Sequence, residues 1–212
     1  ATVNNATVSE GMFRDCAALK KVVLSDKVKT IEGSGFRGCT SLQSLALPSG
    51  LTAIGNWAFS GCTGLGSITV PQSVTNVGTS AFSGCTALKT ADVRSNIVSG
   101  EMFNGCTALT KVSMSDNVKS VGGSAFYGCS NLVDIGFGSN VTEIGTHAFN
   151  RCNALKTVNI GAKVVSVGAS AFRSCERLET VVIPASVKQL GERAFSYCGN
   201  LKNVSLVEGL TT

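Results

Sequence analysis

Histidine occurs once in the 212 residues, tryptophan once and tyrosine twice. A Ser–His–Asp or Cys–His catalytic arrangement would therefore have to include His147, the only imidazole in the chain. A zinc site is also disfavoured, because the chain has no Cys-x-x-Cys pair and only this one histidine to serve as ligands. Motifs for phosphate-binding loops, dinucleotide-binding turns and calcium loops are also missing. The sequence thus predicts a protein that is not an enzyme and that uses no metal and no cofactor.

A strong charge imbalance and a long apolar run are lacking as well. The net charge is only +5, and lysine and arginine are spread along the chain. Nucleic-acid-binding proteins concentrate these residues together with aromatic groups, so we expect no nucleic-acid binding. No apolar run is long enough to cross a membrane, so we expect no membrane insertion. Residues 1–10 show no secretory signal, although removal of such a signal would leave the same start.

Cysteine, in contrast, is plentiful and evenly spaced. The nine cysteines are Cys16, Cys39, Cys62, Cys85, Cys106, Cys129, Cys152, Cys175 and Cys198. They recur every 23 residues, except for one step of 21 between Cys85 and Cys106. A phenylalanine stands three residues before each cysteine, and a leucine stands three residues after it. Self-similarity at such a period predicts a solenoid, because 23 residues are too few for a propeller blade or a pair of helices.

Part of each repeat has the spacing of a helical turn. Phe82, Cys85 and Leu88 recur at intervals that place them on a single buried side. Ser80 is a candidate N-cap for this turn, and Gly84 stands where a helical turn would end. Arginine, serine and tyrosine replace that glycine in the last three repeats, so glycine is preferred there but not required.

The next part of the repeat alternates with a period of two. In residues 65–71, "LGSITVP", apolar and polar residues alternate, which predicts a short strand that Pro71 ends. An apolar return, "SVTNVG", follows, and Gly78 at its end predicts a tight turn. One such coil cannot bury its own core, but stacked coils share one, with the strands in a parallel sheet.

The combined pattern, "LxxVxIPxSVxxIGxxAFxxC", resembles the BspA-like leucine-rich repeats, also called the Treponema pallidum type, over nearly the whole chain. The resemblance implies a leucine-rich-repeat solenoid with one short parallel β-strand per 23-residue repeat and a convex side of short helical turns and loops. It implies a single domain of about nine repeats in residues 1–212. Proteins of this family are found on the surfaces of bacteria and parasitic protists, so the resemblance also implies a cell-surface or secreted location and a role in adhesion.

Two features concern the history and the ends of the chain. The segment "ADVRSNIVSGEMFNGC" at 91–106 matches "ATVNNATVSEGMFRDC" at 1–16, and the likeness continues into the next coil, which indicates a tandem copy of a four-coil block. Residues 1–13 resemble the tail of a coil, and "VSLVEGLTT" at 204–212 stops partway through another. Solenoids normally carry polar caps, and neither end has one. We therefore expect a fragment of a longer protein.

The regular cysteine spacing favours a ladder of reduced, buried thiols, because free cysteine packs as a small apolar residue. Disulfides between neighbouring coils are a less favoured alternative, since stacked side chains point in parallel directions. A metal site remains a third alternative, which the single histidine makes the weakest.

The variable strand positions are the candidate binding surface. They lie four, five and seven residues after each cysteine, on the side of the strand that faces away from the core. The candidate ligand-binding residues on or beside these strands are Lys20, Lys21, Lys89, Asp92, Arg94, Lys111, Lys156 and Lys202. The alternative is a merely solvated sheet face. Few residues of the types that dominate binding hot spots are available, and Trp57, Tyr127 and His147 stand in the predicted convex side instead.

The sequence therefore predicts a protein-interaction module of an adhesin that binds a protein ligand, such as a host matrix or cell-surface protein, through its strands. The alternative is an intracellular or enzyme-attached scaffold, which the reduced cysteines would favour. Asn5, Asn140 and Asn203 each begin an Asn-x-Ser/Thr sequence, and these would carry glycans only in a eukaryotic secretory protein.

Overall fold

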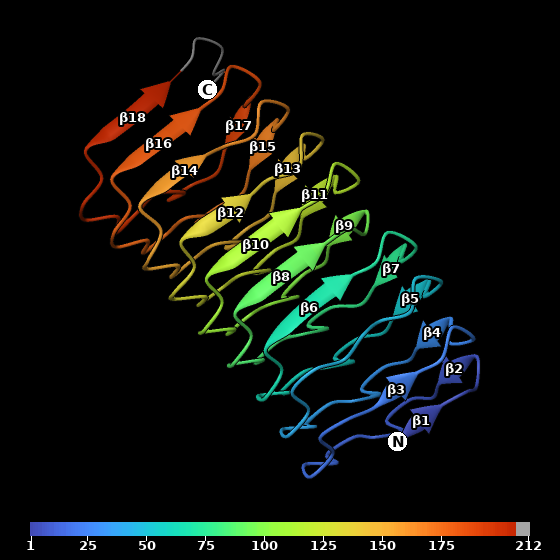
Figure 1. Ribbon diagram of the computed structural model, residues 1–212. Coiled ribbons are helices and arrows are strands. Elements are labelled where there is room, and N and C mark those ends of the chain that lie inside the picture. The colour runs from blue at the N-terminus through green and yellow to red at the C-terminus, as the bar shows by residue number, and fades with distance from the viewer. Residues whose placement is uncertain (207–212) are drawn as a thin grey trace.

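The computed structural model describes residues 1–206, which form a stack of similar coils with β1 at one end of the stack and β18 at the other (Figure 1). One side of the coils carries the longer strands, and we call it the strand face. Its strands are β1 (Thr2–Val3), β3 (Val23–Leu24), β6 (Ser67–Val70), β8 (Thr90–Val93), β10 (Lys111–Met114), β12 (Asp134–Gly136), β14 (Thr157–Asn159), β16 (Thr180–Ile183) and β18 (Asn203–Leu206). Residues 207–212, which include the end of the segment "VSLVEGLTT", lie outside the described residues.

A second side of each coil carries a two-residue strand. These strands are β2 (Thr7–Val8), β4 (Thr30–Ile31), β5 (Ala53–Ile54), β7 (Asn76–Val77), β9 (Ile97–Val98), β11 (Ser120–Val121), β13 (Glu143–Ile144), β15 (Ser166–Val167) and β17 (Gln189–Leu190). All strand pairs on both sides are parallel and join consecutive coils. The predicted parallel solenoid is thus confirmed, and the apolar return of each coil adds a second, shorter ladder.

The phenylalanines stack in one continuous column through the core. Ring centroids of neighbouring coils lie 5.0 to 5.6 Å apart, from the pair Phe13–Phe36 to the pair Phe172–Phe195, with the rings within 12° of parallel. The rings from Phe36 to Phe172 are fully buried. Truncating one buried phenylalanine to alanine typically costs about 3 to 5 kcal/mol, so this column is a major source of the stability of the stack.

The cysteines form a hydrogen-bonded ladder beside the phenylalanines. The Sγ–H of each cysteine from Cys39 to Cys198 donates to the carbonyl oxygen of the phenylalanine of the preceding coil, at 3.0 to 3.3 Å. All nine cysteines are free, and seven are buried as predicted. The prediction of burial is wrong for Cys16, which is exposed, and Cys198 is only half-buried. These two stand in the first and last coils, where a neighbouring coil covers them from one side only.

The segment between the second side and the next strand is not helical, and no regular helix occurs within residues 1–206. Ser80 has a φ of 57°, so it is left-handed and does not act as an N-cap. The predicted glycine position does adopt the left-handed conformation, with a φ of 71° at Gly84. Arg151 and Tyr197 keep that conformation with φ of 63° and 61°. Each coil therefore contains two left-handed residues, and these break the helical turn.

Hydrogen bonds show what replaces the helix. The backbone N–H groups of Trp57, Phe59 and Gly61 donate to carbonyls of the following coil at 2.7 to 3.0 Å. The intervening Ser60 and Cys62 donate instead to carbonyls three residues earlier in their own coil, at 3.0 and 3.1 Å. Alternate donors thus point along the solenoid, so this side also holds neighbouring coils together.

The structure gives a different reason for glycine at the end of the return segment from the one that the sequence suggested. Six glycines occupy this position, namely Gly55, Gly78, Gly122, Gly145, Gly168 and Gly191, and none has a positive φ. A Cβ on any of them would lie only 2.2 to 2.6 Å from a backbone nitrogen of the preceding coil. A turn does begin directly after each of these glycines, as predicted. Glycine is required there by the close approach of two coils and not by a left-handed backbone conformation.

The coil that contains the 21-residue step is shorter in the loop between β8 and β9. Ser95 is fully buried in this loop, and its Oγ donates to the carbonyl of Ile97 at 3.0 Å. Ser99 replaces the close-approach glycine and donates to the carbonyl of Gly78 at 2.8 Å. The second-side ladder is interrupted at this coil, because β7 and β9 belong to different sheets. The pairing of Thr2 with Val23 repeats the 21-residue step, as the duplicated block predicts.

Close approach of the coils can be tested at Gly145. In Gly145→Ala the new Cβ would lie 2.6 Å from the nitrogen of Gly123, and we expect a loss of on the order of 2 kcal/mol in unfolding free energy from overpacking. Gly66→Ala is the matched control, because its Cβ would meet nothing closer than 3.8 Å. Urea denaturation of both variants measures the difference, and equal stabilities would contradict the packing argument.

Thiol labelling tests the cysteine ladder. In the native protein Cys16 should react with a maleimide rapidly and Cys198 more slowly, while the seven buried thiols should react only after unfolding. Mass spectrometry of peptides after timed labelling identifies each site. Rapid labelling of Cys106 or Cys129 in the folded protein would show that the ladder opens readily.

Stability should also fall at alkaline pH. Burial, together with the neighbouring Cys16, raises the pKa of the Cys39 thiol from 9.0 to about 11. Between these values the unfolded chain releases a proton that the folded protein retains, so rising pH favours unfolding. Urea midpoints of the parent and of Cys39→Ala, measured from about pH 8 to about pH 11, should show a shallower decline in the variant. Identical slopes would rule out this thiol as a contributor.

Candidate ligand-binding face

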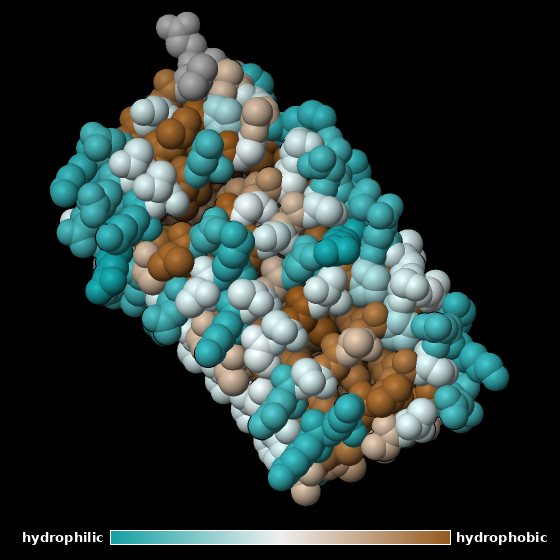
Figure 2. Space-filling view, in the orientation of Figure 1, coloured by the Kyte–Doolittle hydropathy of each residue, from teal (hydrophilic) through white to brown (hydrophobic). Residues whose placement is uncertain are grey.

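The strand face is not one continuous sheet. Its ladders run from β1 to β3, from β6 to β12, and from β14 to β18. Residues 45–47 lie between β3 and β6 without joining either ladder, and only an isolated bridge from Lys21 to Ser44 marks this coil. A second interruption separates β12 from β14. Figure 2 shows hydrophobic surface gathered in two areas of the side that faces the viewer, one toward each end of the solenoid, with hydrophilic side chains around them.

The first interruption contains a hollow of about 670 Å³, which we call the first hollow. Leu45, Leu47 and Ile68 supply its apolar part, and Ser67 and Thr69 supply hydroxyl groups. Arg94 borders it from the loop that follows β8. The hollow thus combines an apolar floor with hydroxyl groups and a guanidinium at its edge.

The second interruption contains a more apolar hollow of about 450 Å³, which we call the second hollow. Phe137 lines it and stands in a column of inward-pointing residues that other coils fill with aliphatic side chains or methionine. Its ring meets the Phe149 ring edge-on, with centroids 5.7 Å apart at 81°. Ile135, Ile160 and Val182 complete the apolar lining. A larger ring in this column therefore coincides with the break in the sheet.

All eight predicted binding residues lie on or beside the strand face, but ion pairs neutralise part of the charge. Lys111 Nζ lies 3.0 Å from the Asp134 carboxylate of the next strand. Lys202 Nζ lies 3.7 Å from the Glu179 carboxylate of the preceding coil. These side chains are about half exposed, and pairs of this kind contribute between about 0 and 1 kcal/mol.

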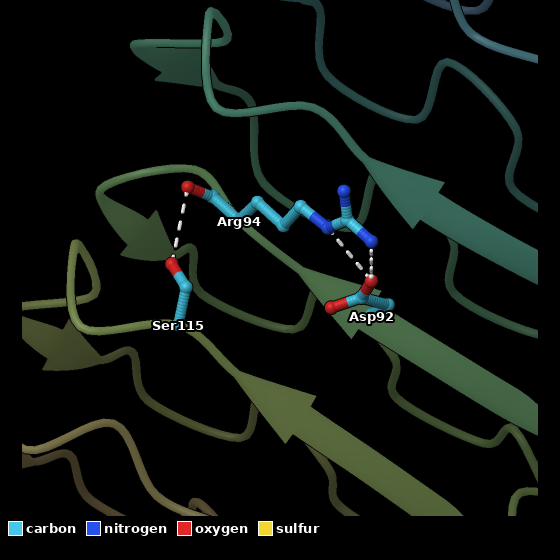
Figure 3. A network of polar contacts seen from close by, with 3 residues as sticks. All are labelled: Asp92, Arg94 and Ser115. Carbon is cyan, nitrogen blue, oxygen red and sulfur yellow. Dashed lines mark hydrogen bonds and ion pairs between the residues drawn. The ribbon is translucent and has the colours of Figure 1, made fainter.

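Arg94 and Asp92 form a closer pair at the end of β8 (Figure 3). The arginine Nε and Nη2 atoms lie 2.8 and 2.7 Å from the same carboxylate oxygen. The Ser115 hydroxyl donates to the backbone carbonyl of Arg94 at 3.3 Å, and so does the Asn117 side-chain amide. These bonds hold the loop, while Asp92 directs the guanidinium back along its own strand (Figure 3). Arg94 and Asp92 thus form one paired unit and not two independent contacts.

The four remaining lysines make no ion pair within residues 1–206. Lys20 and Lys21 lie in the first coil, Lys89 precedes β8, and Lys156 precedes β14. All four are exposed. Lys89 and Lys156 are three coils apart, which is about 14 Å at the usual strand spacing of about 4.8 Å. The structure therefore presents separate positive points along the face and not one basic patch.

The aromatic and histidine candidates lie on other sides of the coils. Arg151 Cζ lies over the Tyr127 ring, 5.7 Å from its centroid. Both residues belong to the turn side, by which we mean the segment between the second-side strand of each coil and the next strand of the strand face. His147 is half-buried, and its Nδ1 lies 3.0 Å from the Asn150 side-chain amide. The sequence indicated that this position is a solvated surface site. That interpretation was incomplete, because the serines at the same position in three other coils, Ser34, Ser80 and Ser170, are buried.

Sequence reasoning missed the two hollows. Their apolar residues stand in columns that the repeat pattern assigns to the core, and nothing in the pattern shows that the ladders stop there. Phe137 was the one available signal, because it is the only aromatic residue in its column. Within residues 1–206 no helix is long and apolar enough to span a membrane, and no cluster of three or more metal-ligating side chains occurs.

Comparison with known proteins supports this architecture. The family model described as BspA type leucine-rich repeat region, with six copies, matches residues 6–100 and 96–212. A leucine-rich repeat protein from Bacteroides ovatus is 32% identical, with a TM-score of 0.87 over 93% of this chain. This chain spans about half of that protein, 51% of its length. No curated protein matches the chain.

Two further structures show the same kind of repeat. A leucine-rich cell surface protein from Faecalibacterium prausnitzii is 26% identical over 94% of this chain and 76% of its own, with a TM-score of 0.54. The leucine-rich repeat protein of T. pallidum is 29% identical over 66% of this chain and 69% of its own, with a TM-score of 0.64. With the family model matched along nearly the whole solenoid, the chain belongs to the BspA-type leucine-rich repeat family.

Proposed function

We propose that the chain is a protein-interaction module of a cell-surface or secreted adhesin, and that its ligand lies across the strand face. The observation that carries this proposal is the pair of hollows at the two breaks of that face. The other coils of the strand face resemble one another closely. The two hollows are therefore the places on this face where the surface differs in shape from a regular sheet. Family membership and the solenoid fold support protein binding in general.

The residues of the strand face indicate which side chains a ligand would need. Apolar side chains of the ligand enter the two hollows, and acidic side chains approach Lys20, Lys21, Lys89 and Lys156. Each exposed ion pair contributes at most about 1 kcal/mol, whereas apolar anchors in desolvated pockets dominate most interfaces. The hollows therefore supply most of the affinity, and the lysines supply orientation and faster association.

A cell-surface setting is the most consistent context. The F. prausnitzii relative is described as a cell surface protein, and the family comprises bacterial surface proteins with these repeats. An adhesin meets a host matrix protein or another cell's surface protein, and an array of weak contacts along many coils suits multivalent attachment of this kind. The proposed binding site of this chain then comprises Lys20, Lys21, Lys89 and Lys156 together with the first and second hollows.

Replacing the four unpaired strand-face lysines with serine tests the charge contribution. We expect binding to immobilised matrix proteins or to cells to weaken and to lose much of its dependence on salt, because exposed charges are screened within about 10 Å at 0.1 M salt. The control replaces Lys27, Lys29, Lys119 and Lys163 with serine, which removes the same charge from positions outside the strand face. Equal loss in both variants would indicate a general charge effect and not a binding face.

Filling the first hollow tests the apolar contribution. Ala46 is exposed and lines the hollow, so Ala46→Arg occupies it without disturbing the core. We expect at least a tenfold loss of affinity, measured by surface plasmon resonance against the same ligands. Thr52→Arg, at an exposed position outside the hollow, is the control. Full binding by both the Ala46→Arg and the lysine variants would place the interaction elsewhere.

A further inference from the structure

Trp57 occupies a position that the packing of the solenoid does not explain. It is the only tryptophan in the chain, and it remains 45% exposed. Its φ is 53°, a left-handed conformation that the fold imposes on the same position in every coil. Small residues satisfy this position in the neighbouring coils, where Ser34 and Ser80 are buried. Glu101 and Arg193 are exposed at the same position in other coils, but their charged side chains are stable in water. An exposed indole gains nothing from solvent and thus indicates a role outside the core.

The indole borders a third hollow, of about 600 Å³, on the second side of the coils. We call it the tryptophan hollow. It extends from Glu10 in the first coil to Asn76 and Gly78 in the fourth. At a spacing of about 4.8 Å between coils, this length of about 14 Å suits a short linear ligand that lies along the solenoid. The strand face and its two hollows are on another side of the coils, so this site is separate from the proposed protein site.

Side chains around the indole have hydrogen-bonding groups that nothing in residues 1–206 uses. The Arg37 guanidinium and the Asn76 carboxamide have no side-chain partner there. Asn56 accepts a bond from the backbone of Thr79 at 2.8 Å through Oδ1, which leaves its amide donors free. Glu32 accepts a bond from the Glu10 backbone at 2.8 Å through Oε2, which leaves its other oxygen free. Free donors and free acceptors therefore stand side by side along the hollow.

We propose that the tryptophan hollow binds an uncharged oligosaccharide, with one sugar ring stacked on Trp57. The C–H face of a pyranose is apolar and packs on an aromatic ring, which offers a large rigid contact at low entropic cost. Its hydroxyl groups both donate and accept, so they match the mixed polar groups of Arg37, Asn56, Asn76 and Glu32. A few polar groups placed around an aromatic surface in a concave site are the general form of a small-ligand site.

The charges of the hollow favour a neutral sugar over an acidic one. Two acidic residues, Glu10 and Glu32, and two arginines, Arg14 and Arg37, are among the residues that line it, so their formal charges cancel. Arg14 is further neutralised by Asp15, with the Nε and carboxylate oxygen 3.4 Å apart. An acidic sugar would meet no net positive charge here. A protein segment anchored on the indole is the alternative occupant, and loss of protein binding alone in Trp57→Ser, tested below, would identify it.

The single tryptophan makes the site directly measurable. Chitotetraose, cellotetraose, mannotetraose and lacto-N-tetraose are the neutral probes, and sialyllactose is the acidic comparison. We expect at least one neutral probe to shift the tryptophan emission with saturation, and sialyllactose to produce no larger effect. Isothermal titration calorimetry then gives the affinity for the responding probe. Failure of all four neutral probes at millimolar concentration would overturn the proposal.

Two substitutions locate the binding. Trp57→Ser restores the residue found at this position in the neighbouring coils and should retain the fold, while affinity for the sugar falls at least tenfold. Arg37→Ala keeps the indole and should weaken binding several-fold. Tyr127→Ser is the control for loss of an aromatic residue elsewhere on the turn side. Unchanged sugar affinity in Trp57→Ser would overturn the assignment of Trp57 to a sugar site. The assignment would also be overturned if Trp57→Ser lost affinity for a protein ligand but not for the sugar.

Discussion

The distance between neighbouring coils is the constraint on which the rest of the structure depends. Parallel pairing on two sides and the alternating bonds of the third side hold each coil directly above the last. At this spacing a side chain meets its own counterpart, so each interior position must suit a copy of itself. Phenylalanine satisfies this by stacking, and cysteine does so by donating to the phenylalanine carbonyl of the coil before it. Glycine is required where backbones come closest.

Function becomes possible where this regularity relaxes. The strand-face ladders stop at residues 45–47 and beside Phe137, and a hollow opens at each break. The short coil interrupts the second-side ladder, and buried Ser95 and Ser99 satisfy its loop with hydrogen bonds of their own. A uniform solenoid would present only a repeating polar sheet. Departures from the repeat therefore carry the shape that a partner can recognise.

The charges of the strand face illustrate why a list of cations is not a binding site. Lys111, Lys202 and Arg94 each have a carboxylate within 4 Å, so a ligand must compete with an existing partner there. Lys20, Lys21, Lys89 and Lys156 do not have this restriction, but they are spread over several coils. In the proposed interaction, weak exposed pairs at separate points provide orientation, and apolar contact in the hollows provides the larger part of the affinity.

The sequence by itself determined the solenoid, its period, the core columns and the position of the short coil. These follow from spacing alone, because a residue that recurs every 23 positions returns to the same place in a stack. It also placed the candidate lysines among the outward-facing positions of the strand face, through the alternation of buried and exposed positions. Phe137 is the only aromatic residue in its column and Trp57 is the only tryptophan in the chain, but the sequence alone did not connect either residue with a hollow.

Only the tertiary structure decided the rest. A spacing of three to four residues fits a helical turn as well as the observed zigzag, and the bonds that select the zigzag exist only between stacked coils. The role of Gly145 and its equivalents was invisible for the same reason, since the clash of a Cβ would be with another coil and not with the local turn. The exposure of Cys16, the pairing of Asp92 with Arg94 and the three hollows likewise depend on which neighbours are present. Local pattern specifies which side of the chain faces inward, whereas contacts between coils decide how the backbone closes and where it leaves a site open.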